Sequence, residues 1–572
     1  MTVIVSIARG HDSSTTLMVD GKIIFYLEEE RITRCKHDGS PLMGLLKVFD
    51  YVDHIDHLVV CHTHRQGPRI DWTNEDLYDG FIRKLARKKF SYTTHFFDGH
   101  HHKMHAACAF YNSGFETAAC VVADGAGSFR NNFKPETKNG EEFTAFEFES
   151  IFKADYINNK DIFENVYKHL GTDACVGLRE FKPNHFLSEY PGITKAYESV
   201  TEYCGFTYID AGKVMGLSPY GKPNDDIPDF FSDDGWVNRS LVTPNYPNGA
   251  DLNIQRYPVL KKEDDNSETY TEIMKDLAYK VQEQTSDRMV EMIRHAHEIT
   301  GEKNIVISGG YGLNCVANYK YWKEFPDLNI YCEPISNDGG TSIGGAKHLW
   351  AQLSEKRTPY QKQESIYYGP QYHPADYLKD LESLEVTDTS YDDIAQLIRN
   401  GNIVTIYQGR SEGGPRALGN RSILFDPTAK NGKDHVNKVK RREWFRPFAC
   451  SIKKEKVHEW FDLAGRDESP HMMFAVKCHD GVDKKIPSVI HVDNTCRIQT
   501  VTQNQNEHYY NLIDAFDKIT GVPILFNTSF NLAGDPLVET VDDAIDTLKR
   551  SEIEYMYLPE IQKLVYVPNE NT

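Results

Sequence analysis

Residues 101–128 read HHKMHAACAFYNSGFETAACVVADGAGS, and the fold of the chain is organised around them. Apolar residues from His101 onward recur at helical spacing, which predicts a helix over residues 101–115. His101 and His105 are four residues apart, so a helix projects both imidazoles from one face, where they can bind one metal ion. An apolar run over residues 118–123 predicts a buried strand that ends at Asp124, a candidate third ligand.

The alternative is that some of these histidines cap the helix or lie on the surface. A lone histidine would favour that interpretation, but the cluster favours a metal. A zinc protease is not favoured, because no glutamate follows the first histidine.

The arrangement of strand, turn and carboxylate occurs a second time. A strand over residues 304–308 runs into the glycine-rich turn 309–314, and a helix is predicted from Cys315. Such turns place backbone N–H groups and a helix N-terminus against phosphate or nucleotide. The next strand, 328–332, is followed by Asp338, with a further helix from Ser342. The repetition predicts two related subdomains that contribute ligands to one cleft.

The N-terminal residues predict strands over 3–8, 15–19 and 23–27, separated by the turn 10–14 and the Asp20-Gly21 hairpin. The actin-like ATPase fold begins with this order, although an ordinary β-meander is the alternative. Further along, we predict a loop over 212–221, because it is rich in glycine and proline, an irregular excursion over 222–266 and a long amphipathic helix over 269–300.

A second α/β domain is predicted after a polar, proline-containing linker over residues 356–371. It starts with a helix over 392–399 and a strand over 403–408. Residues 409–422 then combine three arginines, four glycines and two serines in a flexible, cationic loop. Arginine binds phosphate in a bidentate manner, and glycine lets the backbone approach it. Further cations and hydroxyl groups follow in REWFRPF (442–448) and NTSFN (527–531), and together they predict a phosphate or adenylate site.

The composition excludes several classes of protein. A net charge of −20 over 572 residues argues against a general polyanion binder, but not against a local basic groove. No segment has 18 uncharged apolar residues, so we expect no transmembrane helix and no membrane partner. Eleven cysteines without a C-x-x-C pair indicate reduced thiols and a cytoplasmic location.

The motifs together resemble a known family, the O-carbamoyltransferases of the nodulation-factor, cephem and tobramycin type. The resemblance covers nearly the whole chain, and its motifs follow in order. They are HDSS (11–14), EEERITRCKHD (28–38), HHKMHAACAFY (101–111), ADGAG (123–127), GKVMGLSPYG (212–221), SGGYGLNCVAN (308–318), GGPRALGNRSIL (413–424), REWFRPFA (442–449), HVDNTCRIQTV (491–501) and NTSFN (527–531).

The resemblance implies an α/β protein with two domains. An actin-like domain of the ASKHA class, similar to the threonylcarbamoyladenosine transferase, is expected over residues 1–355. A YrdC-like α/β domain is expected over residues 372–572. The acceptor specificity is expected in residues 222–266, which match no part of the family that we recognise.

The resemblance also implies a reaction in two steps. Carbamoyl phosphate and ATP, the latter with Mg²⁺, form carbamoyl-adenylate and pyrophosphate in the C-terminal domain. The adenylate then moves inside the protein to the N-terminal domain, where a divalent metal, iron in the family, holds it while an acceptor hydroxyl attacks. The implied metal ligands are His101, His105, Asp124 and Asp338. His11 and Lys36 would contact the adenylate or position the acceptor, Gly309, Gly310 and Asn314 would hold the adenosine, and Arg416, Lys440, Arg446, Arg497 and Ser529 would bind the phosphate groups.

The acceptor is less defined than the reaction. Other members of the family modify 5-hydroxymethylcytosine, and a basic segment over residues 81–90, followed by Tyr92, Phe96 and Phe97, suits a polynucleotide. We therefore favour 5-hydroxymethylcytosine in DNA, with a small sugar, nodulation factor or antibiotic hydroxyl as the alternative. A threonylcarbamoyl modification of tRNA and a non-enzymatic nucleotide-binding module are further alternatives. The oligomeric state is left open.

Overall fold

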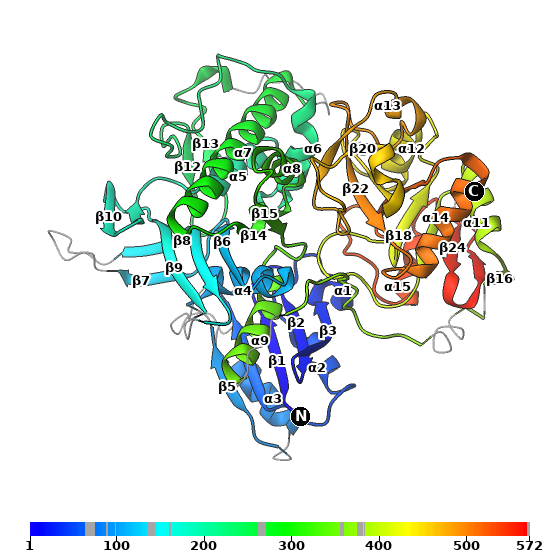
Figure 1. The fold of residues 1–572 in the computed structure, drawn as a ribbon, viewed down its shortest axis with the longest axis horizontal. Helices are drawn as coiled ribbons and strands as arrows, with labels where there is room; N and C mark the ends of the chain where they lie inside the picture. The colour runs from blue at the N-terminus through cyan, green and yellow to red at the C-terminus, as the bar shows by residue number, and fades with distance from the viewer. Residues whose placement is uncertain are drawn as a thin grey trace. The chain divides into compact units, whose positions relative to one another are not determined.

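The chain forms two compact units, each built from two separate pieces of sequence. Unit 1 contains residues 1–10 and 52–362, and unit 2 contains residues 11–51 and 363–572 (Figure 1). Both units mix helices with strands, so the predicted α/β class is confirmed. The predicted domain bounds, 1–355 and 372–572, stay a prediction. The computed structural model describes residues 1–62, 75–86, 90–97, 99–133, 143–158, 162–260, 270–354, 360–373, 381–382 and 384–568.

Unit 1 begins with three parallel strands. β1 (Val3–Ala8) pairs with β4 (His57–Cys61), and β4 pairs with β5 (Thr93–Phe96). The six residues of β1 are all buried, as expected for a parallel strand covered on both faces. α3 (Glu75–Ala86) lies between β4 and β5 in the sequence.

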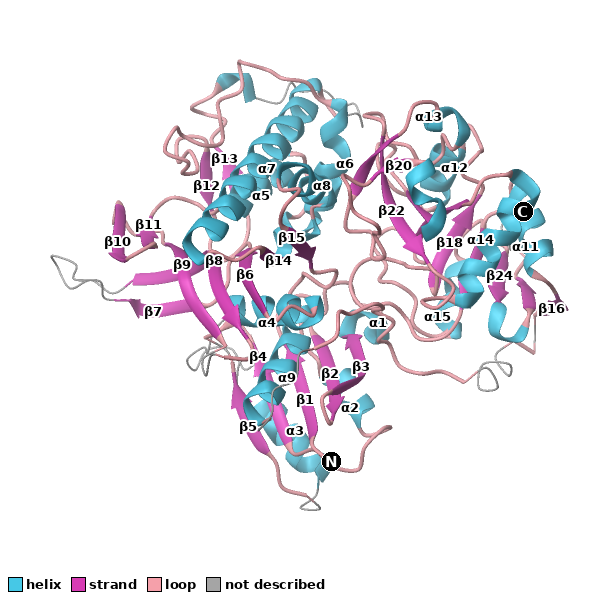
Figure 2. Cartoon of the chain, in the orientation of Figure 1, coloured by secondary structure: helices cyan, strands magenta, loops and turns pink. Residues whose placement is uncertain are grey.

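The larger sheet of unit 1 is mixed, with the strand order β10-β11-β9-β8-β6-β14-β15 and with β7 beside β8 (Figure 2). β6, β14 and β15 run parallel, so their carboxyl ends lie at one edge of the sheet. This edge receives Asp124 and the glycine-rich turn that follows β14. The strands are β6 (Thr117–Ala123), β7 (Phe129–Phe133), β8 (Phe143–Asp155), β9 (Phe163–Gly171), β10 (Leu178–Lys182), β11 (His185–Ser188), β14 (Asn304–Ser308) and β15 (Asn329–Cys332).

Two helices of unit 1 pack closely against each other because a glycine allows it. α4 (His101–Ser113) contacts α9 (Gly340–Leu353) along its length. A Cβ atom on Gly344 would come 2.1 Å from the carbonyl oxygen of Met104, so no larger residue fits there. α4 also places Ala106 and Phe110 against the buried residues of β6 in the core. The backbone of α4 is therefore held firmly, which fixes the direction of its two predicted ligand histidines.

The predicted loop over residues 212–221 is wrong. The structure has α6 (Ala211–Leu217) there, followed by a 3₁₀ turn over Ser218–Tyr220. Val214 and Leu217 are fully buried, and α6 contacts α5 (Ile193–Tyr203) and α7 (Glu272–Thr300). Tertiary burial therefore outweighs the low helix propensity of glycine, and Pro219 sits in the first turn of its 3₁₀ helix, where proline is tolerated.

The rest of unit 1 is largely irregular over residues 222–260, the described part of the predicted excursion. It holds the short pair β12 (Val242–Pro244) and β13 (Ala250–Leu252). α8 (Cys315–Glu324) begins at Cys315, as predicted, and α7 confirms the predicted long helix from Glu272 onward.

Unit 2 is built around a ten-stranded mixed sheet with the order β16-β25-β24-β17-β18-β23-β19-β22-β21-β20. The predicted helix over 392–399 and strand over 403–408 correspond to α11 and β17. The strands of this sheet are β16 (Glu385–Asp388), β17 (Val404–Tyr407), β18 (Arg421–Phe425), β19 (Ala449–Lys453), β20 (Phe461–Asp462), β21 (Ala475–Cys478), β22 (Thr495–Val501), β23 (Ile524–Ser529), β24 (Tyr555–Leu558) and β25 (Lys563–Tyr566). Among the described residues after 363, the helices are α11 (Tyr391–Arg399), α12 (Gly432–Val439), α13 (Val482–Lys485), α14 (Glu507–Thr520) and α15 (Val541–Lys549).

The N-terminal piece of unit 2 consists of the hairpin β2 (Ser14–Val19) and β3 (Lys22–Glu28), followed by α1 (Glu29–Thr33) and α2 (Leu42–Val48). Buried Arg31 donates hydrogen bonds to the carbonyl oxygens of Glu412 and Gly414. Arg34 donates to the carbonyls of Pro536 and Leu537. These bonds join residues 11–51 to residues 363–572 within unit 2.

Candidate active site

Four buried side chains of unit 1 converge on one point. The Nε2 atoms of His101 and His105 are 3.1 Å apart, and their rings are nearly perpendicular. His101 Nε2 lies 3.3 Å from Asp124 Oδ2 and 3.4 Å from Asp338 Oδ1. His105 Nε2 lies 3.8 Å and 3.5 Å from the same two oxygens. The structure therefore brings together all four residues that the sequence analysis names as metal ligands.

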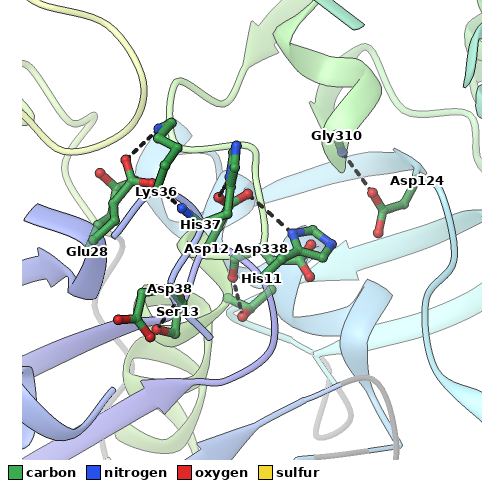
Figure 3. A network of polar contacts seen from close by, with 12 residues as sticks. His11, Asp12, Ser13, Glu28, Lys36, His37, Asp38, Asp124, Gly310 and Asp338 are labelled. Atoms are coloured by element: carbon green, nitrogen blue, oxygen red, sulfur yellow. Dashed lines mark hydrogen bonds and ion pairs between the residues drawn. The ribbon is translucent and has the colours of Figure 1, made fainter. Parts of the chain in front are cut away.

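The elements described above explain this convergence. α4 supplies both histidines from one face, Asp124 follows β6, and Asp338 lies just before α9. Asp124 is held at its other oxygen, because the Gly310 N–H donates to Oδ1 at 3.0 Å (Figure 3). Asp124 Oδ2 is thereby left to face the imidazoles.

The charges of the cluster favour a cation. Burial alone would lower the pKa of His101, but the carboxylates of Asp338 and Asp124 outweigh burial and raise that pKa to about 10. Burial would raise the pKa of Asp124, yet the hydrogen bond with His101 and the charges of both histidines hold it below its ordinary value. Two carboxylates thus demand positive charge at a place where water is largely excluded.

The four residues fit a divalent metal ion. Their ligand atoms all lie within 4.8 Å of one another. Ligand atoms about 2.1 Å from a tetrahedral ion are about 3.4 Å apart, which is close to the measured separations. Two imidazoles and two carboxylates form a borderline-hard set that suits iron, manganese or zinc, so the donor set alone does not select one of them.

The predicted adenosine-binding residues follow β14 at the same edge of the sheet. Gly309 has φ 85° and ψ 166°, a conformation that is restricted to glycine, and its neighbour Gly310 contacts Asp124. Asn314 is already engaged, because its side chain accepts from the Ala317 N–H as the N-cap of α8 and exchanges hydrogen bonds with Gln282. The contribution of Asn314 to adenosine binding stays a prediction. In the structure, Asn314 caps α8 and connects it to Gln282 of α7.

His11 and Lys36, predicted to act on the adenylate or the acceptor, lie in unit 2 within a network that the sequence analysis missed in part (Figure 3). Asp12 lies 3.3 Å from His11 and 2.6 Å from His37, each time between a carboxylate oxygen and Nδ1. Lys36 donates to Glu30 at 2.6 Å. The motifs HDSS and KHD contain Asp12 and His37, but only their proximity in the fold identifies the pair.

A second predicted group gathers cations in the middle of the sheet of unit 2. β19 lies between β22 and β23, and Ala449 pairs with Arg497 on one side and with Asn527 on the other. Arg446 precedes β19, and Ser529 ends β23. Lys440, at the end of α12, donates to the carbonyl and hydroxyl oxygens of Ser529 and to Asn531 Oδ1 at 3.0 Å.

These cations repel one another. Burial lowers the pKa of Lys440 well below its ordinary value, and the neighbouring Arg442 and Arg446 lower it further. Burial, Arg446 and Arg497 likewise lower the pKa of Arg442, whose guanidinium also lies 4.0 Å from the centre of the Phe448 ring. Glu443, 3.5 Å from Arg446, offsets only part of this charge. A bound phosphate would relieve the repulsion. Arg442 is thus a further member of this cluster. It stands in the REWFRPF motif, but no role was predicted for it from the sequence.

In the cationic loop over residues 409–422, two of the three arginines are engaged with backbone carbonyl groups. Arg421 is fully buried and donates to the carbonyls of Gln408, Gly409, Asn420 and Glu539. Arg410 donates to the carbonyls of Ile24, Tyr368 and Gly369. Two of the three arginines therefore fix backbone, and phosphate binding from this loop stays a prediction for Arg416 alone.

Comparison with known families identifies the chain. A model described as "Carbamoyltransferase N-terminus" matches residues 70–347, and one described as "Carbamoyltransferase C-terminus" matches residues 395–563. The chain belongs to the carbamoyltransferase family. This membership confirms the resemblance predicted from the sequence. It also confirms the expectation that the protein is a transferase enzyme.

Its relatives span most of its length. The carbamoyltransferase is 30% identical to "Nodulation protein NolNO" of Sinorhizobium fredii, over 95% of this chain and 77% of that protein. It is also 30% identical to an uncharacterized protein of Synechocystis, over 98% of this chain and 96% of the relative.

Among solved structures, full-length HypF in its phosphate- and nucleotide-bound form covers 62% of the carbamoyltransferase and 56% of its own chain, with 11% identity. The TM-score of this superposition is 0.35. Within the described residues, no helix combines the length and the apolar character that a membrane span requires. All eleven cysteines carry free thiols.

Proposed function

We propose that this carbamoyltransferase is an O-carbamoyltransferase that uses ATP and carbamoyl phosphate and acts through carbamoyl-adenylate. The observation that carries the proposal is the cluster of buried Lys440 with the half-buried Arg442, Arg446 and Arg497, whose mutual repulsion calls for an anionic substrate. Membership of the family indicates that the transferred group is a carbamoyl group. The cationic cluster favours a phosphorylated donor, because arginine and lysine bind phosphate.

The first step forms the adenylate. A carbamate oxygen attacks the α-phosphorus of ATP, a P–O bond forms, and pyrophosphate leaves. The carbamate arises when one water molecule cleaves carbamoyl phosphate, which releases inorganic phosphate. Arg446, Arg497, Arg416 and Ser529 bind the phosphate groups, and Lys440 adds a charge that is already oriented by Asn531. Preorganised cations of this kind stabilise the charge that develops during phosphoryl transfer.

The second step transfers the carbamoyl group to a hydroxyl group. The acceptor oxygen attacks the carbamoyl carbon, and the hydroxyl proton goes to His11. The bond between the carbamoyl carbon and the phosphate oxygen breaks, and AMP leaves. Lys36 orients the adenylate or the acceptor, while Gly309, Gly310 and Asn314 hold the adenosine. A divalent metal would be held by His101, His105, Asp124 and Asp338, and the family resemblance favours iron. When bound, the metal would act as a Lewis acid on a carbonyl or phosphate oxygen.

For the acceptor, we propose the hydroxymethyl group of 5-hydroxymethylcytosine in DNA, with a small sugar or antibiotic hydroxyl as the alternative. Arg83 and Lys84 are exposed near the end of α3, whereas Arg87, Lys88 and Lys89 lie outside the described residues. Incubation with hydroxymethylated DNA and with a panel of aminoglycosides, followed by mass spectrometry, decides between them. A carbamoyl mass shift only on a small molecule would refute the DNA acceptor.

The test of the mechanism separates its two steps. Wild-type protein with ATP and carbamoyl phosphate should release pyrophosphate and phosphate in equal amounts without an acceptor. Arg446→Ala should abolish this release and leave metal binding intact, whereas His101→Ala should lose the metal and the transfer but retain the release. Formation of ADP in place of AMP-linked products would refute the adenylate.

A further inference from the structure

Two short segments of unit 2 that carry His11 and Lys36 are fastened to each other. The backbone N–H and the hydroxyl of Ser13 both donate to the carbonyl of Asp38, at 3.0 and 2.7 Å. Asp12 and His37 both adopt positive φ, 57° and 59°, so both turns are sharp. Such conformations persist only where the surrounding structure fixes them, and they are frequent at functional sites.

The carboxylate of Asp12 is shared by two imidazoles. Asp12 Oδ1 lies 2.6 Å from His37 Nδ1, and Oδ2 lies 3.3 Å from His11 Nδ1 (Figure 3). An ionised carboxylate only accepts hydrogen bonds, so each Nδ1 carries the proton in these contacts. In the neutral ring, Nε2 is then the unprotonated nitrogen, which is the form that a general base needs.

A neighbouring carboxylate completes the arrangement. Glu30 accepts from Lys36 Nζ at 2.6 Å and from the His37 backbone N–H at 2.8 Å. The charged groups in these contacts are Glu30 and Lys36 beside His37, and Asp12 beside both rings. The side chains of Asp12 and Glu30 are 15% and 10% exposed, whereas those of His11 and Lys36 are 38% and 41% exposed. The two carboxylates are thus largely buried, whereas the His11 and Lys36 side chains that they bind reach solvent.

Asp12, Glu30 and His37 are also close enough to one another to hold a metal ion. Their hydrogen bonds argue against it. Each Glu30 oxygen already accepts a bond, one of them from an ammonium group, and the His37 nitrogen that faces Asp12 is a donor. A cation there would have to displace the charge of Lys36.

We propose that Asp12 is a positioning residue that fixes the tautomer of His11, and that His37 is the second imidazole held by the same carboxylate. The inference rests on the proposed function, because His11 accepts the acceptor proton there. When that proton reaches Nε2 of His11, the imidazolium remains paired with Asp12. His37 contacts the other carboxylate oxygen of Asp12 and keeps Asp12 from rotating away from His11.

The test is Asp12→Asn. Asparagine tolerates a positive φ, so the turn is retained. Its amide offers one acceptor and one donor group to two rings that both require an acceptor, so one ring must change to the Nε2–H tautomer. The matched control is Asp20→Asn, which makes the same chemical change at another positive φ, 46°, in the exposed β2–β3 turn.

Two measurements decide the matter. ¹⁵N spectra of histidine-labelled protein, with His11 and His37 assigned by His→Gln variants, should show Nδ1–H in both rings of the wild type and a changed tautomer in Asp12→Asn. The kcat of carbamoyl transfer should fall by about 10²–10⁴-fold, the range of general base catalysis, while pyrophosphate release stays unchanged. Asp20→Asn should behave as wild type in both.

Unchanged tautomers in Asp12→Asn, or transfer within about threefold of wild type, would overturn the proposal. It would also be overturned by one equivalent of Zn²⁺ that still binds to His101→Ala protein and is lost on a further Asp12→Asn change. If no acceptor is ever carbamoylated, the proposed function fails, but the spectra still test the role of Asp12.

Discussion

Replacing Gly309 with alanine should weaken metal binding at a site that Gly309 does not touch. Gly309 follows β14, and a Cβ atom there would come 2.3 Å from the carbonyl oxygen of Ala123. Ala123 is the last residue of β6 and directly precedes Asp124. The added methyl group must therefore push apart the two strand ends that hold Asp124.

The size of the effect follows from two contributions. The backbone conformation of Gly309 costs alanine about 1–3 kcal/mol, to which the contact with the carbonyl is added. Movement of the turn also weakens the hydrogen bond from Gly310 to Asp124. A hydrogen bond to a charged group contributes about 1.5–3 kcal/mol, so its loss should weaken metal binding by about 10–100-fold.

The control is Gly301→Ala. Gly301 also has positive φ, 71°, but no atom lies within 4 Å of its added Cβ. It ends α7, so alanine there should cost about 1–2 kcal/mol of strain and leave the metal site unchanged. Both variants are compared with wild type by thermal unfolding and by competition for Zn²⁺ against a chromophoric chelator.

Zinc affinity of Gly309→Ala within about threefold of wild type would refute the reasoning, since the expected loss is about 10–100-fold. Equal losses of affinity in Gly301→Ala and Gly309→Ala would refute it as well, because strain alone would then explain both.

Three further predictions concern unit 2. Lys440→Met should reduce pyrophosphate release at least about 100-fold without lowering the thermal midpoint, because it removes a buried charge among like charges; a clear fall in the midpoint would instead make Lys440 structural. Arg31→Ala should destabilise the unit by about 3–5 kcal/mol, because it leaves buried Glu28, 2.6 Å away, without its ion-pair partner, whereas the more exposed Arg34→Ala should cost much less; equal urea midpoints of the two variants would contradict this. Burial raises the pKa of Glu29 from 4.5 to about 7, so the folded state holds a proton that the unfolded state releases, and stability should fall as pH rises from about 4.5 to about 7. Glu29→Gln should flatten that slope, and an unchanged slope of urea midpoints against pH would contradict the shift.

The sequence predicts elements well where periodicity and burial agree. The helix that carries His101 and the strand before Asp124 have the predicted character, and both end within two residues of the predicted bounds. The convergence of the four ligand side chains could be anticipated because parallel strands end at one edge of a sheet. α6 was missed because its stability comes from packing against α5 and α7, which no local pattern reveals.

Other features depend on contacts between distant segments. Arg410 and Arg421 have the residue types of a phosphate site, but their carbonyl partners, Ile24 and Glu539 among them, lie up to several hundred residues away in the sequence. The pairing of Asp12 with His37 likewise requires two turns to meet. Composition indicates that such groups are available, and only the fold decides what each one contacts.

The division of unit 2 into two pieces has a consequence for synthesis on the ribosome. Residues 11–51 are made first, but the carbonyl groups that Arg31 and Arg34 require come from residues 412–414 and 536–537. At about 5–20 residues per second, the wait from residue 51 to residue 363 is about 15–60 s. During that time Arg31 and Arg34 lack the carbonyl groups to which they donate in the folded protein. Unit 2 therefore completes its folding only after nearly the whole chain has been translated, and its N-terminal piece is the natural client of a chaperone that binds nascent chains.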